Sequence, residues 1–317
     1  MLENKAIMLA KIEGTYGTDA APTPTANAIL CSAPQIEIIG KAITRNQVIP
    51  YYGALAKINI GEGIKVSFEV EVRGAGAVPS TPPRIGALLR ACNFTETIDA
   101  TPGAEFSKYD PNSLENGESV TIYFYRDGVL HKVLGCVGAF KLSAKLNEQA
   151  KIAFTFTGLY AGTHASDTAF PSPTFGDAVL PPIFRQAAFS IIGYSADIEK
   201  LTLDVANDVK PKKSVNGTAS GVSRYFVANR AVKGDCDPAA VALATFNPWA
   251  QFDASTAGAL SATIGSAAQN RLIVTMPNVI PDTPKYATRE GIVAYGYPFT
   301  AHPTMTTGNN ELSLKFN

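Results

Sequence analysis

The sequence is poor in the residues with which most enzymes and metal proteins do their chemistry. Only three histidines occur among 317 residues, His131, His164 and His302, and none has metal-ligand spacing to another histidine or to a cysteine. The cysteines form no CxxC pair and are typical of buried apolar side chains; they are Cys31, Cys92, Cys136 and Cys236. No GxSxG, HExxH or phosphate-binding P-loop motif is present. The sequence therefore predicts a protein that is not an enzyme and has no cofactor or metal.

Charge is also scarce. Charged residues make up 17% of the chain, and Lys+Arg and Asp+Glu number 27 each. A net charge of zero argues against binding nucleic acid by phosphate neutralisation. Low charge in a folded protein suggests that partners cover part of its surface. No apolar run is long enough to span a membrane, and the first fourteen residues lack the apolar core of a signal peptide. We expect no membrane contact, and synthesis in a reducing cytoplasm.

What the sequence has in abundance is alternation with a period of two. Val66, Phe68 and Val70 alternate with polar residues, which is typical of a strand with one buried face. The same pattern or a β-rich composition recurs at 119–125, 152–157, 201–205, 224–227, 271–276 and 312–316. Asp127-Gly128 lies between two such runs and predicts a type I′ hairpin turn. The sequence therefore predicts a mainly β, antiparallel fold.

Helices are expected to be few and short. One is predicted from Pro82-Pro83 to Cys92, because apolar residues recur there at i, i+3, i+4 and i+7. A second is predicted from Asp237 to Thr245, with Asp237 as N-cap and Pro238 at the first helical position.

Both predicted helices follow a strand that ends in glycine, and this parallel indicates an internal duplication. Gly74 lies 28 positions after Asn46, and Gly234 lies 27 positions after Asn207. Chance is the alternative, because residue identity between the halves is low. The proline-rich stretch between the halves is unsuited to a central strand. We predict a first domain at 1–169 with an N-terminal arm, a linker at 170–182 and a second domain at 183–317.

Two sets of residues are candidates for function. Tyr51, Tyr52 and Leu55 lie in a long connection between strands, where apolar residues often contact a partner or fold back on their own sheet. Glu69 and Glu71 lie on the polar face of one strand. They could form a pair of catalytic carboxylates, but a solvated strand surface is the stronger interpretation, because no partner acid or base is nearby.

Several segments resemble the tail tube proteins, or major tail proteins, of long flexible-tailed phages and related prophages. They cover the chain from end to end and are densest in its first half: 14–23 (GTYGTDAAPT), 27–30 (NAIL), 68–74 (FEVEVRG), 86–92 (GALLRAC), 123–132 (YFYRDGVLHK), 154–160 (FTFTGLY) and 310–314 (NELSL). None of these segments is a catalytic motif, so the resemblance is one of pattern over length.

The resemblance implies two tandem tail-tube-like β-sandwich or β-barrel domains, each with a short flanking α-helix. Inner strands would line a tube, with Glu69 and Glu71 as candidates to face its lumen. Long loops would stack ring on ring, with Tyr51, Tyr52 and Leu55 as a stacking contact. Relatives with one such domain form rings of six subunits, so a two-domain chain is expected to form a pseudo-hexameric trimer, with a hexamer as the other possibility.

The resemblance also implies where the protein acts and with what. It would be made in the cytoplasm of a bacterial host and become part of the phage tail in the virion. Its partners would be copies of itself, the tape-measure protein and the tail terminator, and viral DNA would pass through the lumen without specific binding. Two alternatives remain: a tail-tip or baseplate β-protein, and a carbohydrate-binding β-sandwich adhesin.

Overall fold

The computed structural model describes residues 5–74, 78–160, 162, 164–175, 179–216, 218 and 220–317. The strands of the first half are β1 (Ala6–Ile12), β2 (Ala28–Ile29), β3 (Gln35–Ile43), β4 (Ile58–Glu71), β5 (Phe94–Asp99), β6 (Phe106–Pro111), β7 (Val120–Arg126), β8 (Val129–Lys145), β9 (Lys151–Leu159) and β10 (Ala165–Asp167). Those of the second half are β11 (Ser190–Ile191), β12 (Lys200–Asp204), β13 (Asp208–Lys213), β14 (Val222–Asn229), β15 (Lys233–Cys236), β16 (Gly258–Ile264), β17 (Leu272–Pro281), β18 (Lys285–Arg289), β19 (Ile292–Ala301) and β20 (Ser313–Phe316). The helices are α1 (Pro24–Asn27), α2 (Gly86–Ala91) and α3 (Pro248–Asp253).

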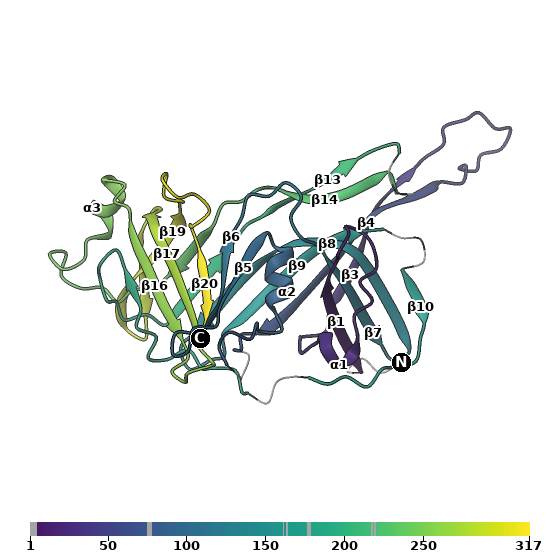
Figure 1. Ribbon diagram of the computed structural model, residues 1–317. Helices are drawn as coiled ribbons and strands as arrows, with labels where there is room; N and C mark the ends of the chain where they lie inside the picture. The colour runs from purple at the N-terminus through teal and green to yellow at the C-terminus, as the bar shows by residue number, and fades with distance from the viewer. Residues whose placement is uncertain are drawn as a thin grey trace.

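One antiparallel sheet runs through the whole molecule. Its strands lie in the order β3–β4–β9–β8–β12–β15–β19. The pairing of β8 with β12 joins the first half of the chain to the second, and β6 pairs with β20 at another junction (Figure 1). The prediction of a mainly β, antiparallel fold of the β-sandwich type is confirmed.

The alternation in the sequence produces the core. On β4, Val66, Phe68 and Val70 are buried, and the residues between them face away from the core. The Phe68 ring packs on that of Phe154 from β9, with 5.7 Å between the centroids. One continuous apolar cluster extends from Met8 to Phe316 and draws on both halves of the chain. Aromatic pairs of this kind add to the stabilisation that burial provides.

The hairpin between β7 and β8 turns at the predicted residues. Asp127 has φ 39° and Gly128 has φ 97°. A type I′ turn requires positive φ at both central residues, and Asn or Asp followed by Gly meets this requirement best. The prediction at Asp127-Gly128 is therefore confirmed.

Of the two predicted helices, one is present and one is not. The helix predicted up to Cys92 is α2, which begins only at Gly86, after the two prolines. The helix predicted from Asp237 to Thr245 is wrong. Asp237 Oδ1 accepts hydrogen bonds from the backbone N–H groups of Glu199 and Lys200, so it caps no helix.

After Asp237, backbone N–H and C=O groups form hydrogen bonds with a neighbouring strand, so they are not available to a helix. The Pro238 carbonyl accepts a hydrogen bond from the Tyr295 N–H, and the Ala240 N–H donates to the Val293 carbonyl. The helix in this region is instead α3, where the Asn247 side chain accepts a hydrogen bond from the Ala250 N–H and Pro248 occupies the first turn.

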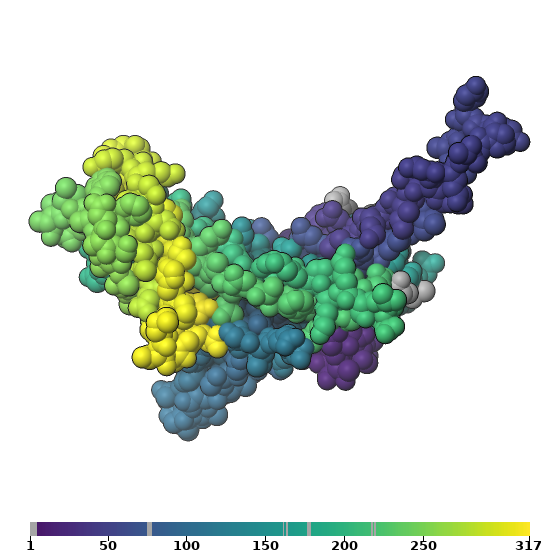
Figure 2. Space-filling view, turned by 90° about the horizontal axis from the view of Figure 1, so that it is seen from above, coloured from purple at the N-terminus to yellow at the C-terminus, as the bar shows by residue number. Residues whose placement is uncertain are grey.

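Two hairpins extend beyond the sheet. The longer one is made of β3 and the start of β4, and we call its outer part, residues 40–60, the arm. Figure 2 shows the arm reaching far out from one corner of the molecule, on the opposite side from the lobe that contains α3. The shorter hairpin, β13–β14, lies beside the base of the arm (Figure 1).

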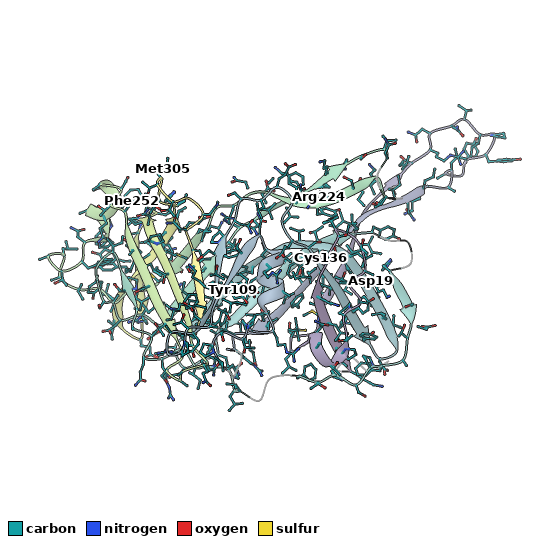
Figure 3. The ribbon with its side chains drawn as sticks, in the orientation of Figure 1. Asp19, Tyr109, Cys136, Arg224, Phe252 and Met305 are labelled. Atoms are coloured by element: carbon teal, nitrogen blue, oxygen red, sulfur yellow. The ribbon has the colours of Figure 1, made fainter. Side chains whose placement is uncertain are left out.

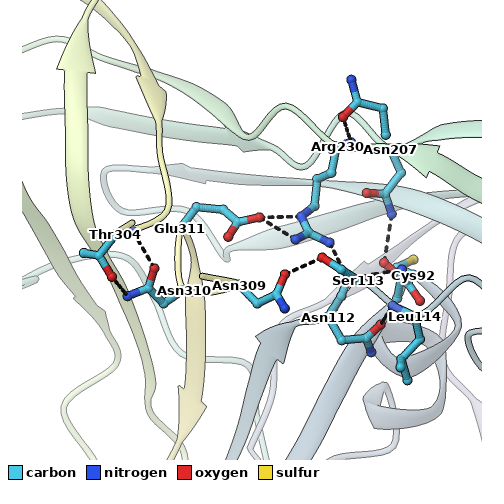
Figure 4. Close-up of polar contacts among 12 residues, drawn as sticks. Cys92, Asn112, Ser113, Leu114, Asn207, Arg230, Thr304, Asn309, Asn310 and Glu311 are labelled. Atoms are coloured by element: carbon cyan, nitrogen blue, oxygen red, sulfur yellow. Dashed lines mark hydrogen bonds and ion pairs between the residues drawn. The ribbon is translucent and has the colours of Figure 1, made fainter. Parts of the chain in front are cut away.

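Polar side chains tie the two halves together where they meet (Figure 4). Arg230 Nε donates to Glu311 Oε1 at 2.6 Å, and Arg230 Nη1 donates to the Asn112 carbonyl at 2.9 Å. The Asn207 amide donates to the carbonyls of Cys92 and Gly138, at 2.8 and 2.9 Å. These contacts link the residues that directly precede β13 and follow β14 to the first half of the chain.

Candidate assembly surfaces

The base of the arm is held by a lysine from each hairpin. Glu62 on β4 lies 3.2 Å from the Nζ atoms of both Lys41 on β3 and Lys213 on β13. Hydrogen bonds from Lys213 and Lys41 lower the pKa of the Glu62 carboxyl. The arm is therefore anchored to the β13–β14 hairpin at its base.

The tip of the arm is exposed. Tyr51 is 78% exposed and Tyr52 is fully exposed, whereas Leu55 is half-buried. Within the described part of the chain, neither tyrosine makes a hydrogen bond or ring contact. More apolar side chains are exposed along the arm and its root: Ile38, Ile43, Val48 and Ile58. Exposed apolar surface on this scale is typical of a site that a partner covers. The role of Tyr51, Tyr52 and Leu55 in stacking stays a prediction.

A tyrosine from the N-terminal segment fixes the β13–β14 hairpin to the sheet. The Tyr225 N–H donates to Tyr16 Oη at 2.6 Å, and the Tyr16 hydroxyl donates to the Gly135 carbonyl at 2.9 Å. Arg224 lies on β14 (Figure 3). Its guanidinium lies 4.7 Å from the centre of the Tyr16 ring. Burial raises the pKa of the Tyr16 hydroxyl, which keeps it protonated as a donor. Both hairpins thus start from a rigid base.

The face of the sheet that points away from the core carries Glu69 and Glu71. Residues directly opposite each other in antiparallel strands lie on the same face, so the strand registers define rows across this surface. One row is Glu69, Ala153, Lys141, Asp204, Lys233 and Thr300. The next is Glu71, Lys151, Ser143, Thr202, Asp235 and Pro298. We call this surface the polar face.

Glu69 and Glu71 differ in their surroundings on the polar face. Glu69 is exposed, and Glu71 forms an ion pair with Arg73. The face carries charges of both signs, because lysines occupy the same rows. That Glu69 and Glu71 face a lumen stays a prediction.

Several strands at the margins of the sheet have one partner strand. Among the strand pairings of the described residues, β3 pairs only with β4 and β18 pairs only with β19, and the other strands of this sheet with a single partner are β2, β5, β10 and β11. Tyr286 of β18 lies opposite Tyr295, whose N–H donates to Pro238 on its other side. The N–H and C=O of Tyr286 therefore point away from β19, towards the free edge. Tyr286 is 67% exposed, and Ile292 and Val293 beside it are exposed as well.

The structure brings two of the histidines together. The rings of His131 and His164 lie 6.3 Å apart, and His131 also stacks on Phe124. Burial, followed by the nearby His164, lowers the pKa of His131. Nowhere in the described ranges do three or more His, Cys, Asp or Glu side chains form a group that could hold a metal ion. The interpretation of His131 as a hairpin side chain agrees with its place on β8.

Among the described residues, no helix has the length and apolar character needed to cross a membrane. All three helices are short, at four, six and six residues.

The exposed apolar side chains of the arm and the free strand edges of β3 and β18 are available for contacts with other chains. A family model described as phage tail tube protein matches residues 3–301, nearly the whole chain. No protein among the curated ones matches it. The mainly β, antiparallel fold and the absence of any long helix in the described residues agree with the family match. The chain therefore belongs to the phage tail tube protein family and is a structural component of the virion tail.

Proposed function

We propose that this protein polymerises into stacked rings that form the hollow tail tube, through which the viral DNA passes, and that it has no catalytic role. The observation that carries the proposal is the pair of free strand edges on β3 and on β18, which lie at the two ends of the strand order β3–β4–β9–β8–β12–β15–β19–β18. Free strand edges are prone to pair with another chain. A closed ring would pair these two edges with each other and leave neither of them free.

The β8–β12 pairing inside the chain suggests how two chains would pair with each other. In the first half the strand order is β3–β4–β9–β8, and in the second half it is β12–β15–β19, with β19 also pairing with β17 and β18. β8 therefore corresponds to β17 and β18, and β12 corresponds to β3. Because β8 pairs with β12 inside the chain, β18 of one copy would pair with the β3 region of the next.

The side chains at the two edges suit such a contact. β3 presents the acidic Glu37 and the exposed Ile38, and β18 presents the basic Lys285 and the exposed Tyr286. Opposite charges would meet, and two apolar side chains would be covered. This complementarity is between different surfaces, so the contact is head to tail.

We further propose that the chain consists of two tandem units, 1–169 and 183–317, joined by the linker at 170–182. Each unit contributes a hairpin that projects from the sheet, β3–β4 in the first and β13–β14 in the second. Three chains would then supply six units, in a pseudo-hexameric homotrimer. The tape-measure protein would lie inside the tube and the tail terminator at its end.

In this arrangement the arm would contact the neighbouring ring. Tyr51 and Tyr52 project far from their own sheet, and covering them would remove apolar surface from water. Leu55 is half-buried near the tip and would support them. A tail-tip or baseplate protein with the same edges would form a ring that does not stack, so the presence of tubes separates the two functions.

The proposal is tested by electron microscopy and mass measurement on concentrated protein. We expect hollow tubes, or rings with three times the chain mass of 33.5 kDa. Thr288→Pro should abolish rings, because proline removes an N–H at the free edge of β18, where prolines are tolerated. Thr288→Ser is the matched control and should assemble. A wild-type protein that stays monomeric at high concentration would refute the proposal.

A further inference from the structure

The polar face combines lysines and carboxylates in a regular arrangement. Five lysines and four carboxylates lie on it within the rows defined above or directly beside them: Lys141, Lys145, Lys151, Lys200, Lys233, Glu69, Glu71, Asp204 and Asp235. The set has one net positive charge, which by its sum alone would attract DNA. The arrangement of the charges therefore matters more than their sum.

Two of the lysines form ion pairs across strands. Lys141 Nζ lies 2.9 Å from Asp204 Oδ2, and Lys200 Nζ lies 2.7 Å from Asp235 Oδ2. The hydrogen bond from Lys200 to Asp235 raises the pKa of this lysine. Both pairs bring together residues from different strands and involve β12, so they lie around the β8–β12 junction.

Two further lysines lie directly opposite a carboxylate. Lys233 on β15 faces Asp204 on β12, and Lys151 on β9 faces Glu71 on β4. Asp204 thus has a lysine on each side, one of them ion-paired. Lys145 is the exception, since it lies opposite Lys200 at the end of β8. Apart from Lys145, each lysine named on this face has a carboxylate next to it.

Each lysine without such a neighbour adds to the affinity of a surface for DNA. An ammonium group that contacts a phosphate releases a counterion, and each contact increases affinity in a salt-dependent way. A lysine that already donates to a carboxylate binds a phosphate less strongly, because the adjacent negative charge repels the phosphate. Pairing is therefore a way to keep lysines on a surface without making that surface bind DNA.

We infer that the polar face is the surface that meets duplex DNA, and that Asp204 and Asp235 mask its lysines so that the DNA backbone passes without being held. The inference rests on the proposed function for the presence of DNA, but the masking is a property of the chain itself. It assigns to Asp204 and Asp235 a role in the interaction with DNA. Glu69 adds a carboxylate that has no lysine opposite, since its partner in the register is Ala153.

The test measures binding of a fluorescent 20-base-pair duplex to the purified full chain by anisotropy. Asp204→Asn/Asp235→Asn keeps the shape of both side chains, and the amide oxygen introduced at position 204 can still accept the hydrogen bond that the Ala206 N–H donates to Asp204. We expect this variant to bind DNA roughly tenfold or more tightly than the wild type at low salt. Its affinity should fall about tenfold between 50 and 200 mM salt, as release of about two counterions requires.

Two further variants make the result specific. Asp110→Asn/Asp208→Asn removes a carboxylate from each of two lysine pairs elsewhere, Lys108–Asp110 and Lys210–Asp208, and should not bind DNA. Adding Lys141→Gln and Lys200→Gln to the first variant should abolish the binding it gained. Equal DNA binding by the control variant, or none by Asp204→Asn/Asp235→Asn, would overturn the inference.

Electron microscopy of the same samples separates this inference from the proposed function. Rings or tubes without gained DNA binding would refute the masking alone. Gained DNA binding in a protein that never assembles would leave the masking in place and refute the tube.

Discussion

At the scale of single residues, the most buried ion pair of the described residues lies at the junction of the two halves. Arg230 and Glu311 are almost completely buried, with side-chain exposures of 10% and 8%. Burying two charges costs desolvation free energy. The attraction between the two side chains offsets this cost only while both partners are present. The arginine also donates to the Asn112 carbonyl, so it links three segments of the chain. Removal of one partner should therefore cost more than removal of both.

We predict that Arg230→Met lowers the free energy of unfolding by about 3–5 kcal/mol, because it leaves the Glu311 carboxylate buried without a counter-charge. Arg230→Met/Glu311→Leu should lose less than the single variant. Urea unfolding followed by circular dichroism measures both. Lys108→Met, in the exposed pair with Asp110, is the control and should change the free energy by about 1 kcal/mol or less. A double variant as unstable as the single one would contradict this account.

At the scale of elements, the sequence contained the information for those that are determined locally. Val66, Phe68 and Val70 predicted their strand, and Asp127-Gly128 predicted its turn, because alternation and positive φ depend on neighbours in sequence. The helix at Asp237 was mispredicted because an Asp-Pro start signals a helix only when no other segment competes for its backbone. Here Tyr295 and Val293 take those hydrogen-bonding groups.

The candidate surfaces were only partly predictable for the same reason. Tyr51 and Tyr52 lie in a long connection, and the sequence was enough to suggest an exposed, partner-binding segment. The pairing of Lys141 with Asp204 was not predictable, because it depends on the register of β8 against β12, which are 55 or more residues apart. The free edge of β18 was not predictable from the sequence either, because whether a strand lies at an edge depends on which other strands pair with it.

The arm gives a prediction at this scale. Tyr51→Ser/Tyr52→Ser should allow rings to form but prevent them from stacking into tubes. The free energy of unfolding should change by less than about 0.5 kcal/mol, because the two exposed side chains make no ring contact or hydrogen bond within the described part of the chain. Negative-stain microscopy and thermal unfolding measure the two effects. Ile98→Ser/Leu180→Ser removes two exposed apolar side chains elsewhere and should still give tubes. Normal tubes from the arm variant would show that Tyr51 and Tyr52 are not needed for stacking.

At the scale of the whole molecule, the two halves form one structural unit. The β8–β12 and β6–β20 pairings cross between them, and a single apolar cluster contains residues of both. Partly buried hydrogen bonds from Asn207 and Arg230 also cross the boundary. Halves joined in this way cannot separate without exposing core residues.

We therefore predict a single cooperative unfolding transition. Differential scanning calorimetry should give one heat-absorption peak, with a calorimetric enthalpy equal to the van't Hoff enthalpy. Cleavage of the chain in the linker at 170–182 should leave the halves associated, because the crossing strands do not depend on the linker. Two separate peaks in the intact protein would show that the halves unfold independently.

The pairing of β8 with β12 has a further consequence for how fast such a ring could close. A contact between two units of the same chain forms at the effective concentration that the linker sets, which for a short connection is in the millimolar range. Half of the junctions in a ring of six units would then exist before any two molecules meet. Ring closure would need only the encounters among three chains, so assembly would remain efficient at protein concentrations where six separate units would rarely meet.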